Sequence, residues 1–158
     1  MQAGNGQGQL RGVVAIGASA GGVEALSQVA AGLSADSSYA YVVVLHMPEG
    51  APSVLARIVD RHGPLPAVTA EHGAELKPGH VYVGKPNYHL LVAEDHVVLS
   101  QGPTENGHRP AINALFRSVA LAFGPRAIGV LLSGVLDDGV LGLGAIRSRG
   151  GITIGTDA

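Results

Sequence analysis

The sequence predicts an α/β domain built around a mostly parallel sheet. Short, continuous apolar runs alternate with longer segments in which apolar residues recur at helical spacing. Such runs are typical of strands buried on both faces, and alternation of strand with helix is typical of a parallel sheet covered by helices. We therefore expect a doubly wound, Rossmann-like arrangement of three layers.

The elements can be assigned in chain order. The apolar run at 12–16 predicts the first buried strand, and Val23, Leu26 and Val29 lie at helical spacing in the segment 22–33 that follows. Most other assignments rest on the same two patterns and on proline, which is favoured in the first turn of a helix. They are strands at 41–45, 127–132 and 152–154, and helices from Pro52 to about Arg61, at 111–123 and at 140–147.

The middle of the chain has a different pattern. Four short strand-like runs, at 68–70, 81–84, 89–93 and 97–100, are separated by turn-forming stretches such as Lys77-Pro78-Gly79. We expect this region to form a small antiparallel hairpin excursion from the main sheet.

Composition restricts the class of protein. The chain has 158 residues, of which 46% are hydrophobic and 14% charged, and its formal net charge is −2. With no basic cluster and only two Phe, four Tyr and no Trp, nucleic-acid binding has little support. No apolar run approaches the roughly 18 residues of a membrane span, so we expect no direct membrane insertion. The absence of cysteine excludes disulfide and thiolate chemistry and fits a cytoplasmic protein.

The domain organisation is simple. Residues 1–10 are polar and glycine-rich and lack the apolar stretch of a signal peptide, so we expect them to form a flexible tail. The length of the remaining segment, 11–158, suits one domain with one sizeable core.

A serine between glycines follows the first predicted strand. The frame Gly17-x-Ser19-x-Gly21 has the spacing of a nucleophile elbow, a sharp turn from strand to helix that exposes a serine hydroxyl. We expect the glycines to be needed because such a turn strains the backbone and crowds side chains next to the serine. The helix N-terminus that follows can hold an oxyanion, but it can equally hold a phosphate.

The phosphate-binding alternatives match the sequence less well. The lysine of a P-loop is missing after Gly22, and the frame also departs from the Gly-x-Gly-x-x-Gly pattern of dinucleotide-binding turns. A plain helix N-cap remains an alternative function for Ser19.

Two further chemically active groups follow strands of the same predicted sheet. His46 follows the strand at 41–45, and Asp137 and Asp138 follow the strand at 127–132. Ligands of parallel sheets bind beyond the carboxyl ends of the strands, so these side chains are expected near Ser19. A serine nucleophile needs a base, usually histidine, and that histidine needs an acceptor to fix its tautomer. The sequence therefore predicts a Ser19–His46–Asp138 triad, in an order that differs from that of α/β-hydrolases.

The other histidines show no tight ligand spacing, so we expect no metal site and no cofactor. They are His62, His72, His80, His89, His96 and His108. His108 and Arg109 precede the helix at 111–123, where they either line the same cleft as substrate-binding groups or form an exposed helix start.

Several motifs in order resemble the CheB-type chemotaxis methylesterases, from about residue 12 to the end of the chain. They are Ile16 to Gly22, Val44 to Pro48, Lys77 to Val83, His89-Leu90, His108 to Pro110, Leu115 to Ala120, and Gly129 to Gly134 followed by Asp137-Asp138-Gly139. The resemblance implies a serine hydrolase that removes methyl groups from glutamate methyl esters of chemoreceptors, and some members of the family also deamidate receptor glutamines. It implies Ser19 as nucleophile, His46 as general base and acid, and Asp138 as the orienting carboxylate. The N–H of Ala20 is an oxyanion-hole candidate by the geometry of the elbow.

The chain departs from the family pattern in three places. Val135-Leu136 stands where the family usually has Met-Gly, and Ala20 where the chemotaxis enzymes commonly have threonine. The family's catalytic domain continues with further strand and helix, so this domain is expected to be truncated at its C-terminus. These departures leave open an alternative, a catalytically impaired module that binds the receptor or the methyltransferase.

Overall fold

The computed structural model describes residues 9–46, 54–132 and 137–155. Its main sheet has six strands in the order β3-β4-β2-β1-β7-β8, and all neighbouring pairs are parallel. The strands are β1 (Gly12–Ala18), β2 (Tyr39–Leu45), β3 (Ala67–Thr69), β4 (Val81–Val83), β7 (Ala127–Leu132) and β8 (Ile152–Gly155). Strand order reverses beside β1, because β2 pairs on one side of it and β7 on the other. This is the position where a doubly wound sheet opens a crevice at its carboxyl edge.

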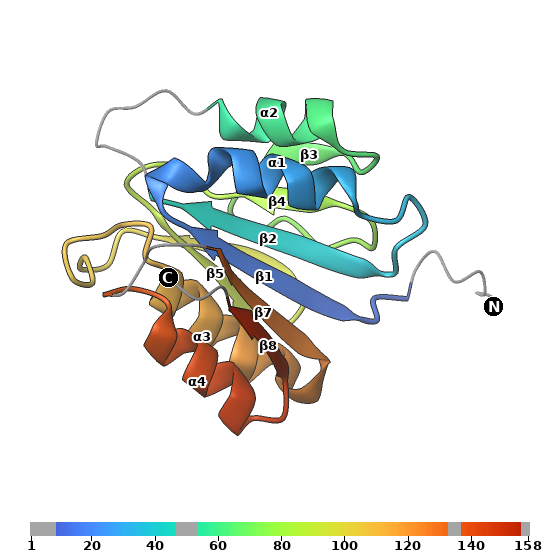
Figure 1. The fold of residues 1–158 in the computed structure, drawn as a ribbon. Coiled ribbons are helices and arrows are strands. Elements are labelled where there is room, and N and C mark those ends of the chain that lie inside the picture. The colour runs from blue at the N-terminus through green and yellow to red at the C-terminus, as the bar shows by residue number, and fades with distance from the viewer. Residues whose placement is uncertain (1–8, 47–53, 133–136, 156–158) are drawn as a thin grey trace.

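Helices cover both faces of this sheet, as Figure 1 shows. The helices α1 (Val23–Ala31) and α2 (Leu55–His62) lie on one face, and α3 (Ile112–Phe123) and α4 (Val140–Ser148) lie on the other. Two short 3-10 turns complete the description, η2 (Ala20–Gly22) before α1 and η3 (Gly124–Arg126) after α3. The α/β fold class with helices on both faces is therefore confirmed.

The core has two halves, one on each face of the sheet. Side chains alternate along a strand, so Ile16 and Val43 pack in the half beneath α1 and α2 while Val13 and Val42 pack in the half beneath α3 and α4. Phe116 of α3 is fully buried in the second half. Because both faces are covered, the central strands consist of continuous apolar residues rather than alternating ones.

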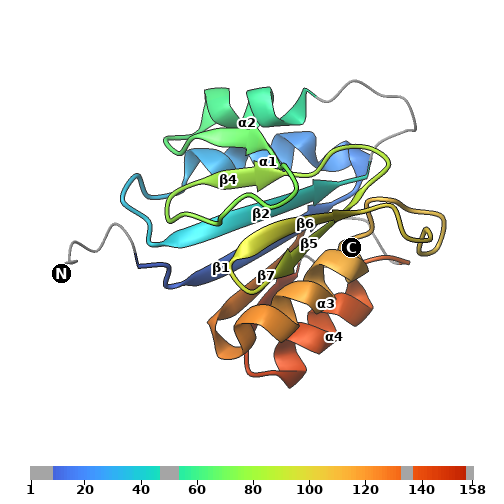
Figure 2. The same ribbon diagram turned by 180° about the vertical axis from the view of Figure 1, so that it is seen from behind.

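Only part of the middle region forms the predicted antiparallel excursion. β5 (His89–Ala93) and β6 (His96–Ser100) pair antiparallel and pack beside α3, visible from behind in Figure 2. In contrast, β3 and β4 join the main sheet as parallel strands, which corrects their expected place in the hairpin. Turn residues show where a strand ends, but they do not show which partner it will pair with.

The predicted element boundaries agree with the structure to within a few residues. The strand at 127–132 is reproduced without change, and the predicted helices at 22–33 and 111–123 correspond to η2 with α1 and to α3. The start of the helix predicted from Pro52 lies outside the described residues. Leu10, placed in the predicted tail, packs against the core just before β1. Among the described residues, no helix is both long and apolar enough to cross a membrane.

Candidate active site

Ser19 lies between the last residue of β1 and the first of η2, at the carboxyl edge of the sheet. Its backbone is extended, with φ of −75° and ψ of 171°, and its carbonyl accepts a hydrogen bond of 2.8 Å from the N–H of Gly22. These dihedral angles are ordinary for any residue, so the strained backbone expected of an elbow is not present at Ser19. Gly21 also does not meet the expected crowding, since a Cβ built there would have no neighbour within 4 Å.

Gly17 is required for a different reason, the close approach of helix α3. A Cβ at Gly17 would lie 2.4 Å from the Cγ2 of Ile112, the first residue of α3. The glycine therefore allows the start of α3 to press onto the end of β1.

We expect Gly17→Ala to destabilise the protein by about 1–3 kcal/mol, since overpacking at a buried contact forces side chains and backbone apart. The variant should also displace Asp138, because the backbone N–H of Ile112 donates to its carboxylate. The free energy of unfolding, measured by urea denaturation, tests the first effect. Gly21→Ala is the matched control from the same motif and should stay within about 0.5 kcal/mol of the parent. Equal costs for the two variants would contradict this account.

His46 lies next to Ser19 because of the register of the first two strands. Ala18 pairs with Leu45 at the end of the β1–β2 ladder, and the N–H of His46 donates to the carbonyl of Ala18 at 3.0 Å. The residue after each strand thus emerges at the same edge. Sequence alone predicted the edge, and the register determines that the two residues are neighbours there.

A short hydrogen bond joins His46 to Asp138. The distance from His46 Nε2 to Asp138 Oδ2 is 2.7 Å, and the two residues are 92 positions apart in the chain. An ionised carboxylate only accepts hydrogen bonds, so the proton of the neutral imidazole lies on Nε2. This tautomer leaves the lone pair of His46 on Nδ1, where the ring can accept a proton.

The carboxylate of Asp138 is buried and fully engaged. Asp138 is 1% exposed, and its Oδ2 and Oδ1 accept hydrogen bonds from the backbone N–H groups of Ile112 at 2.6 Å and Asn113 at 2.7 Å. These N–H groups belong to the first turn of α3, where the helix dipole also favours negative charge. Asp138 therefore caps α3 from a distant loop.

The environment of Asp138 keeps it ionised. Burial acts to raise the pKa of this carboxyl, but the hydrogen bonds from His46 and the two backbone N–H groups, with the charge of His46, outweigh burial. The pKa of Asp138 consequently lies below its ordinary value of 3.8. The carboxylate is thus charged at neutral pH and can stabilise an imidazolium at His46.

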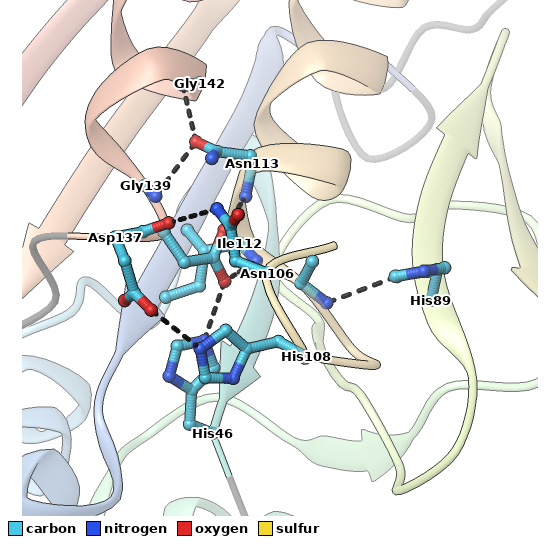
Figure 3. A network of polar contacts seen from close by, with 11 residues as sticks. His46, His89, Asn106, His108, Ile112, Asn113, Asp137, Gly139 and Gly142 are labelled. Carbon is cyan, nitrogen blue, oxygen red and sulfur yellow. Dashed lines mark hydrogen bonds and ion pairs between the residues drawn. The ribbon is translucent and has the colours of Figure 1, made fainter. Parts of the chain in front are cut away.

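Asn113 is a site residue that the sequence reasoning missed. Its side-chain Oδ1 accepts hydrogen bonds from the N–H of Gly139 at 2.9 Å and of Gly142 at 2.7 Å, as drawn in Figure 3. The side chain thereby joins the start of α3 to the start of α4 and holds the segment that carries Asp138. One feature of the sequence could have identified Asn113. It is a polar residue in the otherwise apolar stretch from Ile112 to Leu115, and a buried amide needs hydrogen-bond partners.

His108 and Arg109 lie beside His46. The rings of His108 and His46 are stacked, with centroids 3.8 Å apart and planes 5° apart. A cavity of about 180 Å³ adjoins His46, His108 and Arg109, and Pro86 and Asn87 line it as well. The guanidinium of Arg109 donates to the carbonyls of Gln101 and Gly102, so it is held by a neighbouring loop.

His89 has a structural environment. It is 4% exposed, its Nδ1 accepts from the N–H of Ala111 at 3.2 Å, and its Nε2 donates to the carbonyl of Pro103 at 2.8 Å. Both ring nitrogens are used to hold the chain that leads into α3. No group of three or more potential ligands for a metal ion occurs among the described residues.

Ala20 is the first residue of η2, directly after Ser19. The first N–H groups of a helical turn have no acceptor within the helix, which is the property an oxyanion hole needs. Val135-Leu136, the departure next to this region, lies outside the described residues.

A hollow larger than the cavity beside His46 lies elsewhere on the described surface. It has a volume of about 1140 Å³ and lies at the amino ends of β2, β3 and β4, lined in part by Ser38, Pro66 and His80. None of the predicted site residues lines it. The candidate triad and this larger hollow are therefore at opposite edges of the sheet.

Comparison with known proteins identifies the family of this chain. The family described as CheB methylesterase matches residues 14–158. A protein-glutamate methylesterase/protein-glutamine glutaminase of Geobacter metallireducens is 42% identical over 91% of this chain and 42% of its own length, and one of Methanosarcina mazei is 38% identical over 94% and 42%. The chain thus spans about two fifths of the length of these relatives. The crystal structure of the Thermotoga maritima CheB methylesterase catalytic domain superposes with a TM-score of 0.85 at 31% identity, over 90% of this chain and 77% of that one. This chain belongs to the CheB methylesterase family.

Proposed function

We propose that residues 11–158 form a catalytic domain that hydrolyses glutamate methyl esters of chemoreceptors, in chemotaxis adaptation or related signalling. The observation that carries the proposal is the hydrogen bond of 2.7 Å between His46 and an ionised, buried Asp138, next to Ser19 at the same sheet edge. This is the arrangement in which a histidine can activate a serine hydroxyl.

The proposed reaction proceeds through an acyl-enzyme. Ser19 Oγ attacks the ester carbonyl while His46 Nδ1 takes its proton, and Asp138 stabilises the resulting imidazolium. His46 then gives the proton to the departing methoxide, which leaves as methanol. Water, deprotonated by His46, attacks the acyl-enzyme, and His46 returns that proton to Ser19 Oγ as it leaves. The glutamic acid product then loses its proton to solvent, so Ser19 and neutral His46 are regenerated. The backbone N–H of Ala20 is our candidate donor to the oxyanion of both tetrahedral intermediates.

The cavity beside His46 is the proposed place for the substrate side chain. His108 and Arg109 line it and are our substrate-binding candidates. A glutamine side chain differs from the methyl ester only in its leaving group, so the same site would deamidate receptor glutamines with loss of ammonia. The relatives from both organisms are named for both activities.

The expected partners follow from this substrate. We propose a methyl-accepting chemoreceptor or a related signalling protein as the substrate, and the corresponding methyltransferase as a second partner. We also propose that the protein acts in the cytoplasm, which the absence of cysteine fits. No cofactor is needed for the proposed reaction.

The experiment is methanol release from a methylated receptor by the purified chain, combined with a fluorophosphonate that reacts with activated serines. We expect methanol to be released, and mass spectrometry should locate the phosphonyl group on Ser19. A chain that binds the receptor but releases no methanol and takes no label would contradict the proposal and support a non-catalytic binding module. Stabilisation by nucleotides without either reaction would support a phosphate-binding domain instead.

A further inference from the structure

Two aspartates in succession face two histidines that are stacked on each other. Asp138 binds His46 at 2.7 Å, and the neighbouring Asp137 has its Oδ2 3.5 Å from the Nε2 of His108. The histidine rings lie face to face, 3.8 Å between centroids and 5° between planes. We propose that His108 is a positioning residue that holds the imidazole of His46, and that Asp137 in turn holds His108. This inference rests on the proposed function, since it assigns a role relative to the catalytic base.

The stack supplies a restraint that the hydrogen bond to Asp138 does not. A single bond through Nε2 fixes one edge of the His46 ring but permits the ring to tilt about that bond. A parallel ring in contact with its face limits this tilt sterically, since tilting the His46 ring would bring its atoms too close to those of His108. The tilt decides where the lone pair of Nδ1 points, and proton transfer from a serine requires that direction to be correct.

The position of His108 is itself determined by two loops. Its backbone forms a two-bond bridge with Glu105, with His108 N–H donating at 2.9 Å and Glu105 N–H donating at 3.0 Å. The side chain of Asn106 donates to the carbonyl of Asp137 at 2.6 Å (Figure 3). Asp137 is thus tied to this loop through its carbonyl as well as through its carboxylate. The loop that precedes α3 and the loop that follows β7 are thereby joined above His46.

Exposure distinguishes the roles of the two aspartates. The side chain of Asp138 is 0% exposed and that of Asp137 is 65% exposed. A solvated carboxylate interacts weakly at 3.5 Å, so Asp137 acts on the orientation of His108 rather than on the charge of His46. In this proposal, His46 and Asp138 carry out the proton transfer, and His108 and Asp137 fix the orientation of the His46 ring.

The test compares three variants by the rate at which the fluorophosphonate labels Ser19, which requires no receptor. His108→Ala removes the ring and should slow labelling by about tenfold to a hundredfold, the cost of a misplaced catalytic group. His108→Phe keeps a flat ring and should stay within about threefold of the parent. Asp137→Asn should slow labelling by about two- to fivefold. His96→Ala is the matched control, because this histidine also faces an aspartate, Asp95 at 3.7 Å, but on the hairpin.

A second measurement follows the ring of His46 directly. In ¹⁵N NMR spectra, the share of His46 molecules with the proton on Nε2 should fall in His108→Ala and be restored in His108→Phe. Labelling of His108→Ala at the parent rate, or of His108→Phe as slowly as His108→Ala, would overturn the proposal. If the parent protein neither takes label nor releases methanol, the esterase function is wrong, and unchanged His46 signals in His108→Ala would then separately overturn the positioning role.

Discussion

Asp138→Asn is expected to lower kcat for ester hydrolysis by about 10³- to 10⁴-fold. The carboxylate accepts from three donors, two backbone N–H groups and the Nε2–H of His46. Asparagine offers one acceptor oxygen and one NH₂ group, so the NH₂ group must face either the N–H of Asn113 or both the N–H of Ile112 and the ring of His46. If the NH₂ group faces the ring, it donates to Nε2 and drives the proton of His46 to Nδ1, where a lone pair is needed. Methanol release with methylated receptor measures this loss.

The control for this charge is Asp95→Asn. Asp95 is an exposed aspartate next to the hairpin strand β6, and its substitution should leave kcat unchanged. The two variants remove the same charge, so a difference between them reports position rather than net charge. An Asp138→Asn variant that folds and keeps a tenth or more of the parent kcat would exclude the proposed role of Asp138.

Ser19→Ala is expected to abolish methanol release, with a loss on the order of 10⁶-fold in kcat, as found when a nucleophilic serine is removed from such a unit. The fold should persist, because the turn is closed by the carbonyl of Ser19 and the N–H of Gly22, which alanine retains. Circular dichroism and the urea midpoint check the fold, and the fluorophosphonate should no longer attach. Methanol release near the parent rate would show that another group is the nucleophile.

A second substitution at this position uses the absence of cysteine from the chain. Ser19→Cys places a single thiol in the protein. If His46 acts on position 19, this thiol should react with iodoacetamide faster than a cysteine placed at exposed Ser34, and His46→Ala should remove the advantage. Equal rates at the two positions would indicate that His46 does not reach residue 19.

Most of the fold could be predicted from local pattern. The continuous apolar runs at β1, β2 and β7 predict strands buried on both faces because helices cover both sides of the sheet. The pairing of β3 and β4 could not be predicted in the same way. Short strands of three residues carry little periodicity, and their partners depend on contacts far away in the chain.

The candidate site is similar: the sequence predicted which residues take part, but not the contacts that hold them in place. The serine between glycines, His46 and Asp138 were found from their places at strand ends. The roles of the glycines were not, because Gly17 is explained by its contact with Ile112, almost a hundred residues later. Asn113 was missed for the same reason, since its two hydrogen-bond donors belong to the start of α4.

By itself, then, the sequence determined the α/β class, the sheet edge and the three residue types that the proposed chemistry requires, since these follow from hydrophobic periodicity and strand ends. Only the tertiary structure decided the tautomer of His46, the capping of α3 by Asp138 and the stacking of His108 on His46. Each of these depends on distances between 2.6 and 3.8 Å that join segments remote in the chain. Packing of complete side chains sets such distances, and no local pattern of residues encodes them.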